Sequence, residues 1–166
     1  EYGSGSTFRI ELDQWRSPKE DIASTQTGLQ EGPSLSSRPK VLCIEDNLSN
    51  LKLYQAIFRS RPGFEIITTM HGMEGVDLAR TILPNLILLD LHLPDIHGYE
   101  VCLMLQQDPQ TSQIPIVVIS ADATQSQKSR LLSMGVSEYL TKPLVVSEFL
   151  RVLDQHLQPK LDFYET

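Results

Sequence analysis

The sequence has few cysteines, few basic residues and no long apolar run. Its two cysteines, Cys43 and Cys102, both lie in apolar segments, so we expect reduced core cysteines rather than a disulfide or a metal site. Lys and Arg number 14 against 21 Asp and Glu, and the net charge of −7 argues against a nucleic-acid or anionic membrane partner. No apolar run approaches the roughly 18 residues of a membrane span, and no signal peptide opens the chain. These absences predict a cytoplasmic protein.

Two N-terminal segments differ from the rest of the chain. Residues 13–38 are rich in Ser, Thr, Pro, Gly and Gln and have few large apolar groups, which predicts a flexible linker. In residues 1–12, Phe8, Ile10 and Leu12 alternate with polar residues, which is the pattern of a half-buried strand. Because a lone strand is not stable, we interpret this segment as a piece of another domain, with a remnant of cloning as the alternative.

Residues 39–158 form the predicted main domain, and residues 159–166 form a short C-terminal tail. Within the domain, short apolar runs alternate with segments of helical periodicity. The predicted strands span residues 40–45, 64–69, 85–90, 114–120 and 137–141, and the predicted helices span residues 47–60, 72–83, 98–108, 124–135 and 145–157. This alternation predicts an α/β fold in which a parallel sheet carries helices on both faces.

Polar residues stand at the carboxyl ends of the predicted strands, where doubly wound sheets bind their ligands. Glu45 and Asp46 follow the first strand, and Asp90 ends the apolar run of the third. Ser120 ends the fourth strand, and Lys142 follows the fifth. Two carboxylates about 4 Å apart repel each other by about 4 kcal/mol at an effective dielectric constant of about 20, so three together need a cation. Oxygen ligands in a half-open pocket suit Mg²⁺.

This set of groups meets the needs of phosphoryl transfer to a carboxylate. The transition state spreads negative charge over the equatorial oxygens, which Mg²⁺, Lys142 and the Ser120 hydroxyl can stabilise. Asp90 would then be the nucleophile and would form an aspartyl-phosphate. Each residue alone also has an ordinary explanation as a turn, cap or surface residue. Their joint placement at one sheet edge favours the functional interpretation.

The segments "VLCIEDN", "LILLDLHLPDIHGYE", "VVISADA" and "YLTKPL" resemble, in order and spacing, the motifs of response-regulator receiver domains over residues 39–158. The resemblance implies a flavodoxin-like doubly wound (βα)5 three-layer sandwich with strand order 2-1-3-4-5. It also implies Mg²⁺-dependent transfer from a phosphohistidine donor to Asp90. Asp46, Asp90 and the backbone carbonyl of His92 are then expected to hold the metal, while Glu45 acts through water. The family more commonly has Asp where Glu45 stands, so direct and water-mediated coordination both remain open.

The resemblance also assigns a conformational switch. Ser120 takes the hydroxyl position and Tyr139 the aromatic position of a switch that remodels the face made by the fourth helix, the fifth strand and the fifth helix. That face is also the candidate dimer interface. His92 and Asp122 are expected to tune the lifetime of the aspartyl-phosphate, and the alternative is that both are merely exposed loop residues.

Two smaller expectations concern single features. The Lys142-Pro143 peptide bond is expected to be cis, as the resemblance implies. His92 and His97 lie five residues apart, which places them on no common helix face and disfavours a zinc pair.

The N-terminal "GSGSTFRIEL" resembles the last glycine-rich turn and final strand of a histidine-kinase ATPase domain. It implies that the chain is the C-terminal receiver of a hybrid sensor histidine kinase. This parent kinase can be anchored in a membrane. No histidine is followed by the acid and proline of a phosphohistidine box, so the donor histidine lies elsewhere. The expected partners are the dimerisation domain of a kinase and a histidine phosphotransfer protein. Enzyme status stays open, because the only expected catalysis is phosphorylation and dephosphorylation of Asp90 itself.

Other functions of this fold class fit the sequence less well. Within the family, the alternative is a stand-alone single-domain response regulator that acts by protein contact. A flavodoxin-like cofactor module would need a glycine- or hydroxyl-rich phosphate loop after the first strand, where Glu45 and Asp46 would repel the phosphate. A phosphatase with an aspartyl nucleophile would need a second acid two residues after Asp90, where His92 stands. The residues therefore favour a phosphorelay receiver.

Overall fold

The computed structural model of the chain describes residues 38–122 and 124–157. The fragment predicted at 1–12 and the tail predicted at 159–166 lie outside the described residues. The same is true of the predicted linker at 13–38, apart from its last residue.

Five strands and five helices alternate along the described residues, as the sequence predicts. The strands are β1 (Lys40–Ile44), β2 (Glu65–Thr69), β3 (Leu86–Leu89), β4 (Ile116–Ser120) and β5 (Glu138–Thr141). The helices are α1 (Leu48–Arg59), α2 (Gly72–Ile82), α3 (Gly98–Gln107), α4 (Gln125–Ser133) and α5 (Val146–Leu157). The bounds differ from the predicted ones by at most two residues.

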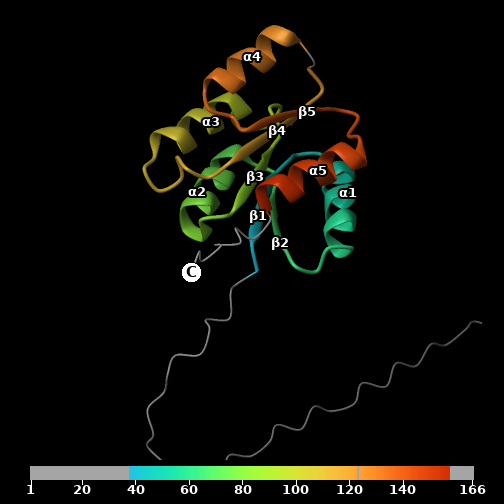
Figure 1. The fold of residues 1–166 in the computed structure, drawn as a ribbon. Coiled ribbons are helices and arrows are strands. Elements are labelled where there is room, and N and C mark those ends of the chain that lie inside the picture. Colours follow the sequence, from blue (N-terminus) through green and yellow to red (C-terminus); the bar gives the residue numbers. More distant parts are fainter. Residues whose placement is uncertain (1–37, 123, 158–166) are drawn as a thin grey trace, which may run out of the picture. The chain divides into compact units, whose positions relative to one another are not determined.

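The strands form one parallel sheet in the order β2-β1-β3-β4-β5, with helices on both faces (Figure 1). This arrangement confirms the predicted flavodoxin-like doubly wound sandwich. Ile44, the last residue of β1, stands opposite Thr69 of β2 and Leu89 of β3. Ser120, the last residue of β4, stands opposite Thr141 of β5. The residues that follow these strands therefore emerge at one edge of the sheet.

The sheet separates two hydrophobic clusters. α1 and α5 pack on one face, and α2, α3 and α4 pack on the other. Within β1, Val41 and Cys43 belong to the first cluster, whereas Leu42 and Ile44 belong to the second. Because both faces are covered, each central strand is apolar on both sides, which explains the unbroken run of β3. Cys43 and Cys102 are free and buried, as predicted.

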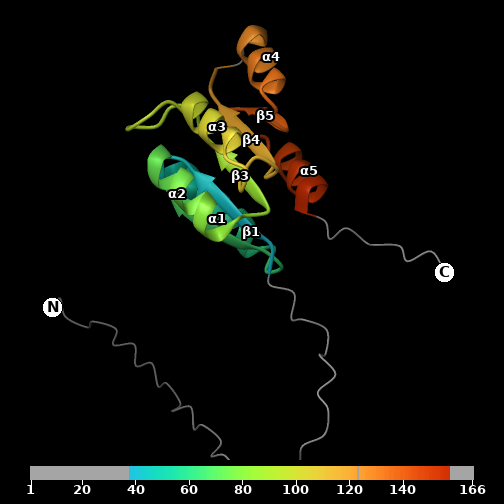
Figure 2. The ribbon, with the colours of Figure 1, turned by 90° about the vertical axis from the view of Figure 1, so that its left-hand side faces the viewer.

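α4 is the helix with the weakest hydrophobic attachment among those described. Leu131 is its one buried residue, whereas each of the other helices buries four. In both Figure 1 and Figure 2, α4 lies at the end of the domain away from α1 and α2. A helix held by so little apolar burial can shift at low cost, since burial is the main attraction that fixes a helix to a sheet.

Two glycines allow close packing beside the acidic edge of the sheet. A Cβ added at Gly98 would overlap the backbone carbonyl oxygen of Asp90, and the Gly98 N–H donates to Leu91 O at 2.8 Å. A Cβ added at Gly75 would overlap the side chain of Ile44. These positions therefore need glycine for space, and Gly98 in particular lets the loop after β3 fold back on itself.

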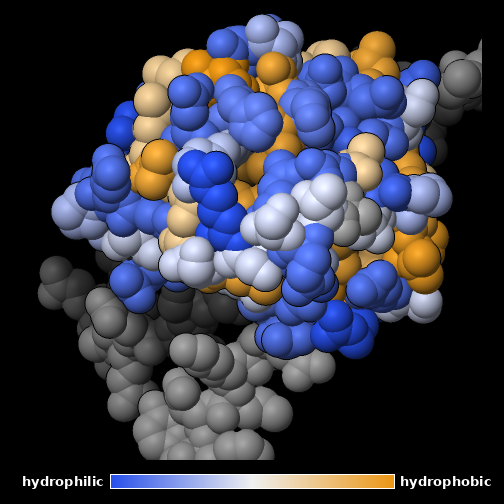
Figure 3. Space-filling view, turned by 90° about the horizontal axis from the view of Figure 1, so that it is seen from above, coloured by the Kyte–Doolittle hydropathy of each residue, from blue (hydrophilic) through white to orange (hydrophobic). Residues whose placement is uncertain are grey.

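The exposed apolar side chains are spread over several elements. The most exposed of them are Leu48 at the start of α1, Val145 before α5 and Leu83 after α2. On the face drawn in Figure 3, hydrophobic residues form separate patches between hydrophilic ones. Among the described helices, none combines the length and hydropathy that crossing a bilayer requires.

Candidate functional site

Lys142 joins two buried carboxylates at the carboxyl edge of the sheet. Its Nζ lies 2.6 Å from Asp90 Oδ2 and 2.9 Å from Glu45 Oε2. Glu45 and Asp90 are only 1% and 5% exposed, and each directly follows its strand. The Lys142 N–H donates to Ser120 O at 2.9 Å, which places the lysine beside the end of β4. The structure thus brings together four of the residues predicted from the strand ends.

The acidic residues form a cluster that suits a hard cation. Glu45, Asp46 and Asp90 each offer a carboxylate oxygen, and these oxygens all lie within 4.8 Å of one another. Asp90 Oδ1 also accepts a hydrogen bond from the His92 N–H at 3.2 Å. Carboxylate oxygens at this spacing are the donors that Mg²⁺ prefers, so the residues fit the predicted metal.

At this edge of the sheet, the ammonium of Lys142 and the carboxylates beside it stabilise each other's charged forms. Burial alone would lower the pKa of Lys142, but its hydrogen bonds to Asp90 and Glu45 more than offset burial and leave that pKa raised. The lysine therefore stays an ammonium. Beneath it, burial first and the charge of Glu45 second raise the pKa of Cys43, which keeps this thiol neutral. A neutral thiol adds no charge to the site and no metal ligand.

Glu45 accepts hydrogen bonds from α1 and from the N-cap of that helix, which were not among the predicted site residues. Its Oε1 accepts from Asn47 N at 3.2 Å and from Asn50 Nδ2 at 3.1 Å. Its Oε2 accepts from the hydroxyl of Tyr54 at 3.2 Å. A signal was available, since residues 47, 50 and 54 follow one another at helical spacing and share the face of α1 that meets the end of β1.

The two predicted switch residues meet at the backbone of Asp122. Ser120 is fully buried, and its Oγ accepts from the Asp122 N–H at 3.2 Å. Tyr139 is 4% exposed, and its hydroxyl donates to the Asp122 carbonyl oxygen. The backbone of Asp122, shortly before α4, is therefore bonded to both side chains.

The loop after β3 brings two histidines close together, although their sequence spacing places them on no common helix face. The rings of His92 and His97 lie edge to face with their centroids 5.8 Å apart. His97 Nδ1 accepts from the Tyr99 N–H at 3.2 Å and caps α3. A neutral imidazole that accepts at Nδ1 carries its proton on Nε2, so His97 presents no second lone pair for a metal. The Lys142-Pro143 bond nearby is cis, as predicted.

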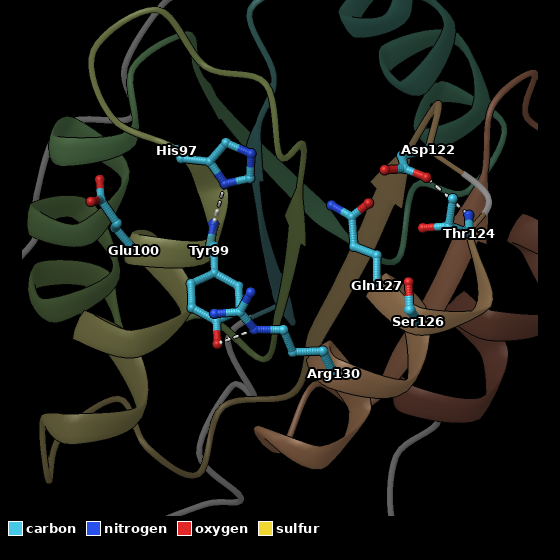
Figure 4. A pocket seen from close by; sticks show the side chains of 8 residues that line it. All are labelled: His97, Tyr99, Glu100, Asp122, Thr124, Ser126, Gln127 and Arg130. Atoms are coloured by element: carbon cyan, nitrogen blue, oxygen red, sulfur yellow. Dashed lines mark hydrogen bonds between the residues drawn. The ribbon is translucent and has the colours of Figure 1, made fainter.

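A groove opens between the starts of α3 and α4 (Figure 4). The Arg130 guanidinium lies over the Tyr99 ring, 4.2 Å from its centroid, and Arg130 Nε donates to the Tyr99 hydroxyl at 2.8 Å. His97 and Asp122 line the same groove, so it adjoins the loops after β3 and β4. Nothing in the sequence pattern pairs Arg130 with Tyr99, because the two residues lie 31 positions apart.

Comparison with known proteins places this geometry in a family. Residues 41–154 match the family model of the response regulator receiver domain. The chain therefore belongs to the response regulator receiver domain family, and it is a receiver domain of the two-component type.

The relatives include proteins of several signalling systems. The polar-differentiation response regulator DivK of Brucella anthropi is 35% identical over 117 residues, which cover 70% of this chain and 94% of DivK. The receiver domain of the sensor histidine kinase PA1611 from Pseudomonas aeruginosa is 27% identical with a TM-score of 0.66, and the match covers 73% of this chain and 98% of that one. That structure has a magnesium ion coordinated in its active-site cleft. The phosphorylated cyanobacterial phytochrome response regulator RcpA is 28% identical with a TM-score of 0.62, covering 74% of this chain and 96% of RcpA.

Proposed function

We propose that this receiver accepts a phosphoryl group from a phosphohistidine onto Asp90 in a Mg²⁺-dependent reaction. The observation that carries the proposal is the contact of Lys142 Nζ with Asp90 Oδ2 at 2.6 Å, beside a cluster of three carboxylates. A carboxylate oxygen of Asp90 forms the new P–O bond while the P–N bond to the donor histidine breaks. The bonding electron pair stays on the imidazole nitrogen. Lys142 is placed to stabilise charge on a phosphoryl oxygen.

The metal site consists of residues at the same edge. Asp46, Asp90 and the backbone carbonyl of His92 would hold Mg²⁺, and Glu45 would act from outside its coordination shell. When bound, the ion neutralises negative charge on the phosphoryl group during transfer. The oxygen donors of this chain support the assignment, as does the magnesium ion in the cleft of the PA1611 receiver.

Phosphorylation is proposed to act through Ser120, Tyr139 and Asp122. The Ser120 hydroxyl would turn toward the phosphoryl group and give up its hydrogen bond with the Asp122 N–H. Because the Tyr139 hydroxyl bonds the carbonyl of the same residue, the change would pass to α4, β5 and α5. The weak attachment of α4 supports this route. His92 and Asp122 are proposed to tune the lifetime of the phosphorylated state.

The remodelled face is proposed to carry the signal to a partner. That partner is the dimerisation domain of a kinase, a histidine phosphotransfer protein or a second copy that pairs through α4, β5 and α5. We place residues 1–12 in a kinase ATPase domain, residues 13–38 in a linker, residues 39–158 in the receiver and residues 159–166 in a tail. The parent would then be a hybrid histidine kinase that works in the cytoplasm, and the kinase context of the PA1611 receiver supports this.

A stand-alone response regulator that acts by protein contact is the second candidate. It is favoured by the match to DivK, because the aligned region covers 94% of that response regulator. Both candidates require the same chemistry at Asp90.

The test uses acetyl phosphate as a small donor and intact mass as the readout. The wild-type chain is expected to gain one phosphate that is stable in acid and labile in base, and only in the presence of Mg²⁺. Asp90→Asn should gain none. The matched control is Asp77→Asn, which removes an exposed carboxylate on the outer side of α2 and should be labelled like the wild type. Equal labelling of Asp90→Asn would show that another residue is the acceptor.

A further inference from the structure

Arg130 of α4 contacts Tyr99 of α3 across the groove between these two helices (Figure 4). The central carbon of its guanidinium lies 4.2 Å from the centroid of the Tyr99 ring, and its Nε donates to the Tyr99 hydroxyl at 2.8 Å. A guanidinium is attracted to the negative face of an aromatic ring, and the hydrogen bond fixes its direction. The contact therefore sets both the distance and the orientation between α3 and α4 at this point.

The two ends of this contact are anchored to different degrees. Tyr99 packs against the hydrophobic cluster beneath α3, and its N–H donates to Nδ1 of His97, the N-cap of that helix. α3 buries four residues, whereas α4 buries Leu131 alone. Tyr99 is therefore a fixed platform on a firmly packed helix, and Arg130 is an exposed residue of a weakly packed one. It follows that the contact restrains α4 rather than α3.

We propose that the contact between Arg130 and Tyr99 is an autoinhibitory restraint that holds α4 against α3 in the unphosphorylated receiver. The inference deepens the proposed function and rests on it in one respect, which is that phosphorylation of Asp90 moves α4. The Arg130–Tyr99 contact is then one that this movement has to break. It adds a restraint from α3 to the one that Tyr139 provides from β5 through the Asp122 carbonyl.

The strength of the restraint follows from its two components. A contact that is made in only one of two states favours that state by a factor set by the free energy of the contact. A hydrogen bond of this kind contributes about fivefold, and a guanidinium stacked on a ring at an exposed site contributes about twofold. The contact is therefore expected to favour the docked position of α4 by about tenfold, which is large for a helix with one buried residue.

The deciding experiment measures amide hydrogen exchange in α4 of the full, unphosphorylated chain, corrected for the intrinsic exchange rate of each sequence. Arg130→Ala should raise exchange in α4 about tenfold. Tyr99→Leu keeps an apolar side chain on the core and removes the ring and its hydroxyl. It should raise exchange to the same extent in the wild-type background and not at all in the Arg130→Ala background. Lys128→Ala removes a positive charge from an exposed position of the same helix, and this control should match the wild type.

Three results would overturn the restraint in variants that a thermal melt shows to be folded. Exchange equal to wild type in Arg130→Ala would show that the contact does not hold α4. A rise in Arg130→Ala with none in Tyr99→Leu would assign the effect to the charge of Arg130 in the last turn of α4, where a cation interacts with the helix dipole. An equal rise from Tyr99→Leu in both backgrounds would assign it to packing of α3.

The link to phosphorylation has a separate measurement. In the wild type, the NMR signal of the Arg130 Nε–H should move toward that of a free arginine when acetyl phosphate and Mg²⁺ are added, and it should stay in place in Asp90→Asn. A signal that stays in place while Asp90 is labelled would overturn the opening of the contact. Failure of the proposed function looks different, since the wild type would then not be labelled at Asp90, and exchange in the unphosphorylated chain would still decide the restraint.

Discussion

The carboxylate of Asp95, in the loop between β3 and α3, caps the N-terminus of α2. Its Oδ1 accepts from the Gly72 N–H at 2.8 Å. Oδ2 accepts from the next amide, Met73 N, at 2.9 Å. The loop that carries Asp90 is thereby tied to the helix that packs against β1. The hydrogen bond from Met73, and after it the one from Gly72, hold the pKa of Asp95 at about 2. A helix N-terminus favours a negative charge at this position.

Asp95→Ala is expected to lower the free energy of unfolding by about 1 kcal/mol at pH 7, as loss of an N-cap does. The pKa of Asp95 falls from 3.8 to about 2 on folding, so its contribution is complete above the unfolded value. It is lost as the pH falls through the folded value. The difference between wild type and variant should therefore be constant from pH 7 to about pH 4 and shrink toward pH 2.

Urea denaturation at a series of pH values measures this difference. Asp77→Ala is the control, because Asp77 is an exposed residue of α2 whose carboxylate lies 3.4 Å from the guanidinium of Arg80 in the same helix. It should change stability by less than about 0.5 kcal/mol. A difference for Asp95→Ala that persisted unchanged below the folded pKa would rule out the charged cap as its cause.

Gly98 and Gly63 offer a matched pair of substitutions. A Cβ at Gly98 would overlap the Asp90 carbonyl oxygen, whereas a Cβ at Gly63 would meet nothing within 4 Å. Gly98→Ala is expected to cost about 1–3 kcal/mol of stability, since backbone rather than a flexible side chain must move. Gly63→Ala should be neutral or stabilise by up to about 1 kcal/mol through the unfolded chain. Denaturant titrations compare the two, and equal effects would contradict the crowding inferred at Gly98.

The fold was predictable because several independent sequence signals agree. Apolar runs, helical periodicity and turn residues all mark the same alternation, and every element lies within two residues of its predicted bounds. Helix ends were less certain. The helix predicted to reach Leu83 ends at Ile82, and Leu83 has a positive φ of 45°. A leucine in this conformation before a proline gives no signal of its own, since glycine is the usual residue there.

The site was predictable only where its residues follow strands. The register of a parallel sheet carries Glu45, Asp90 and Lys142 to one edge, so their meeting follows from topology. Contacts made through side chains or loops had no such rule. Tyr54 has the helical spacing of a core residue, and this spacing does not indicate that its hydroxyl bonds Glu45. Asp95 caps a helix 23 residues earlier in the chain, and no local pattern links the two.

Tyr139→Phe is expected to loosen the segment before α4 while the ring stays buried. The variant lacks the hydroxyl that donates to the Asp122 carbonyl, and α4 has one buried residue to hold it. Amide hydrogen exchange within α4 should rise about fivefold in the unphosphorylated chain, which corresponds to the loss of one hydrogen bond. Tyr54→Phe is the control, because it removes a buried hydroxyl on the opposite face of the sheet and should leave exchange in α4 unchanged. If amide exchange in α4 were the same in Tyr139→Phe as in the wild type, the Tyr139 hydroxyl would not restrain α4.

Lys142→Ala separates metal binding from phosphoryl transfer. It removes the ammonium that pairs with both Glu45 and Asp90, so the negative charge at the sheet edge rises and Mg²⁺ should bind at least as tightly as in the wild type. The rate of phosphorylation by acetyl phosphate at saturating Mg²⁺ should nevertheless fall about 10- to 100-fold. A charge-assisted hydrogen bond contributes about 1.5–3 kcal/mol, and the variant cannot make one to the phosphoryl oxygen. Lys52→Ala, on the exposed side of α1, is the control and should keep the wild-type rate. If Lys142→Ala were labelled as fast as the control, the lysine would hold the carboxylates in place without acting on the phosphoryl group.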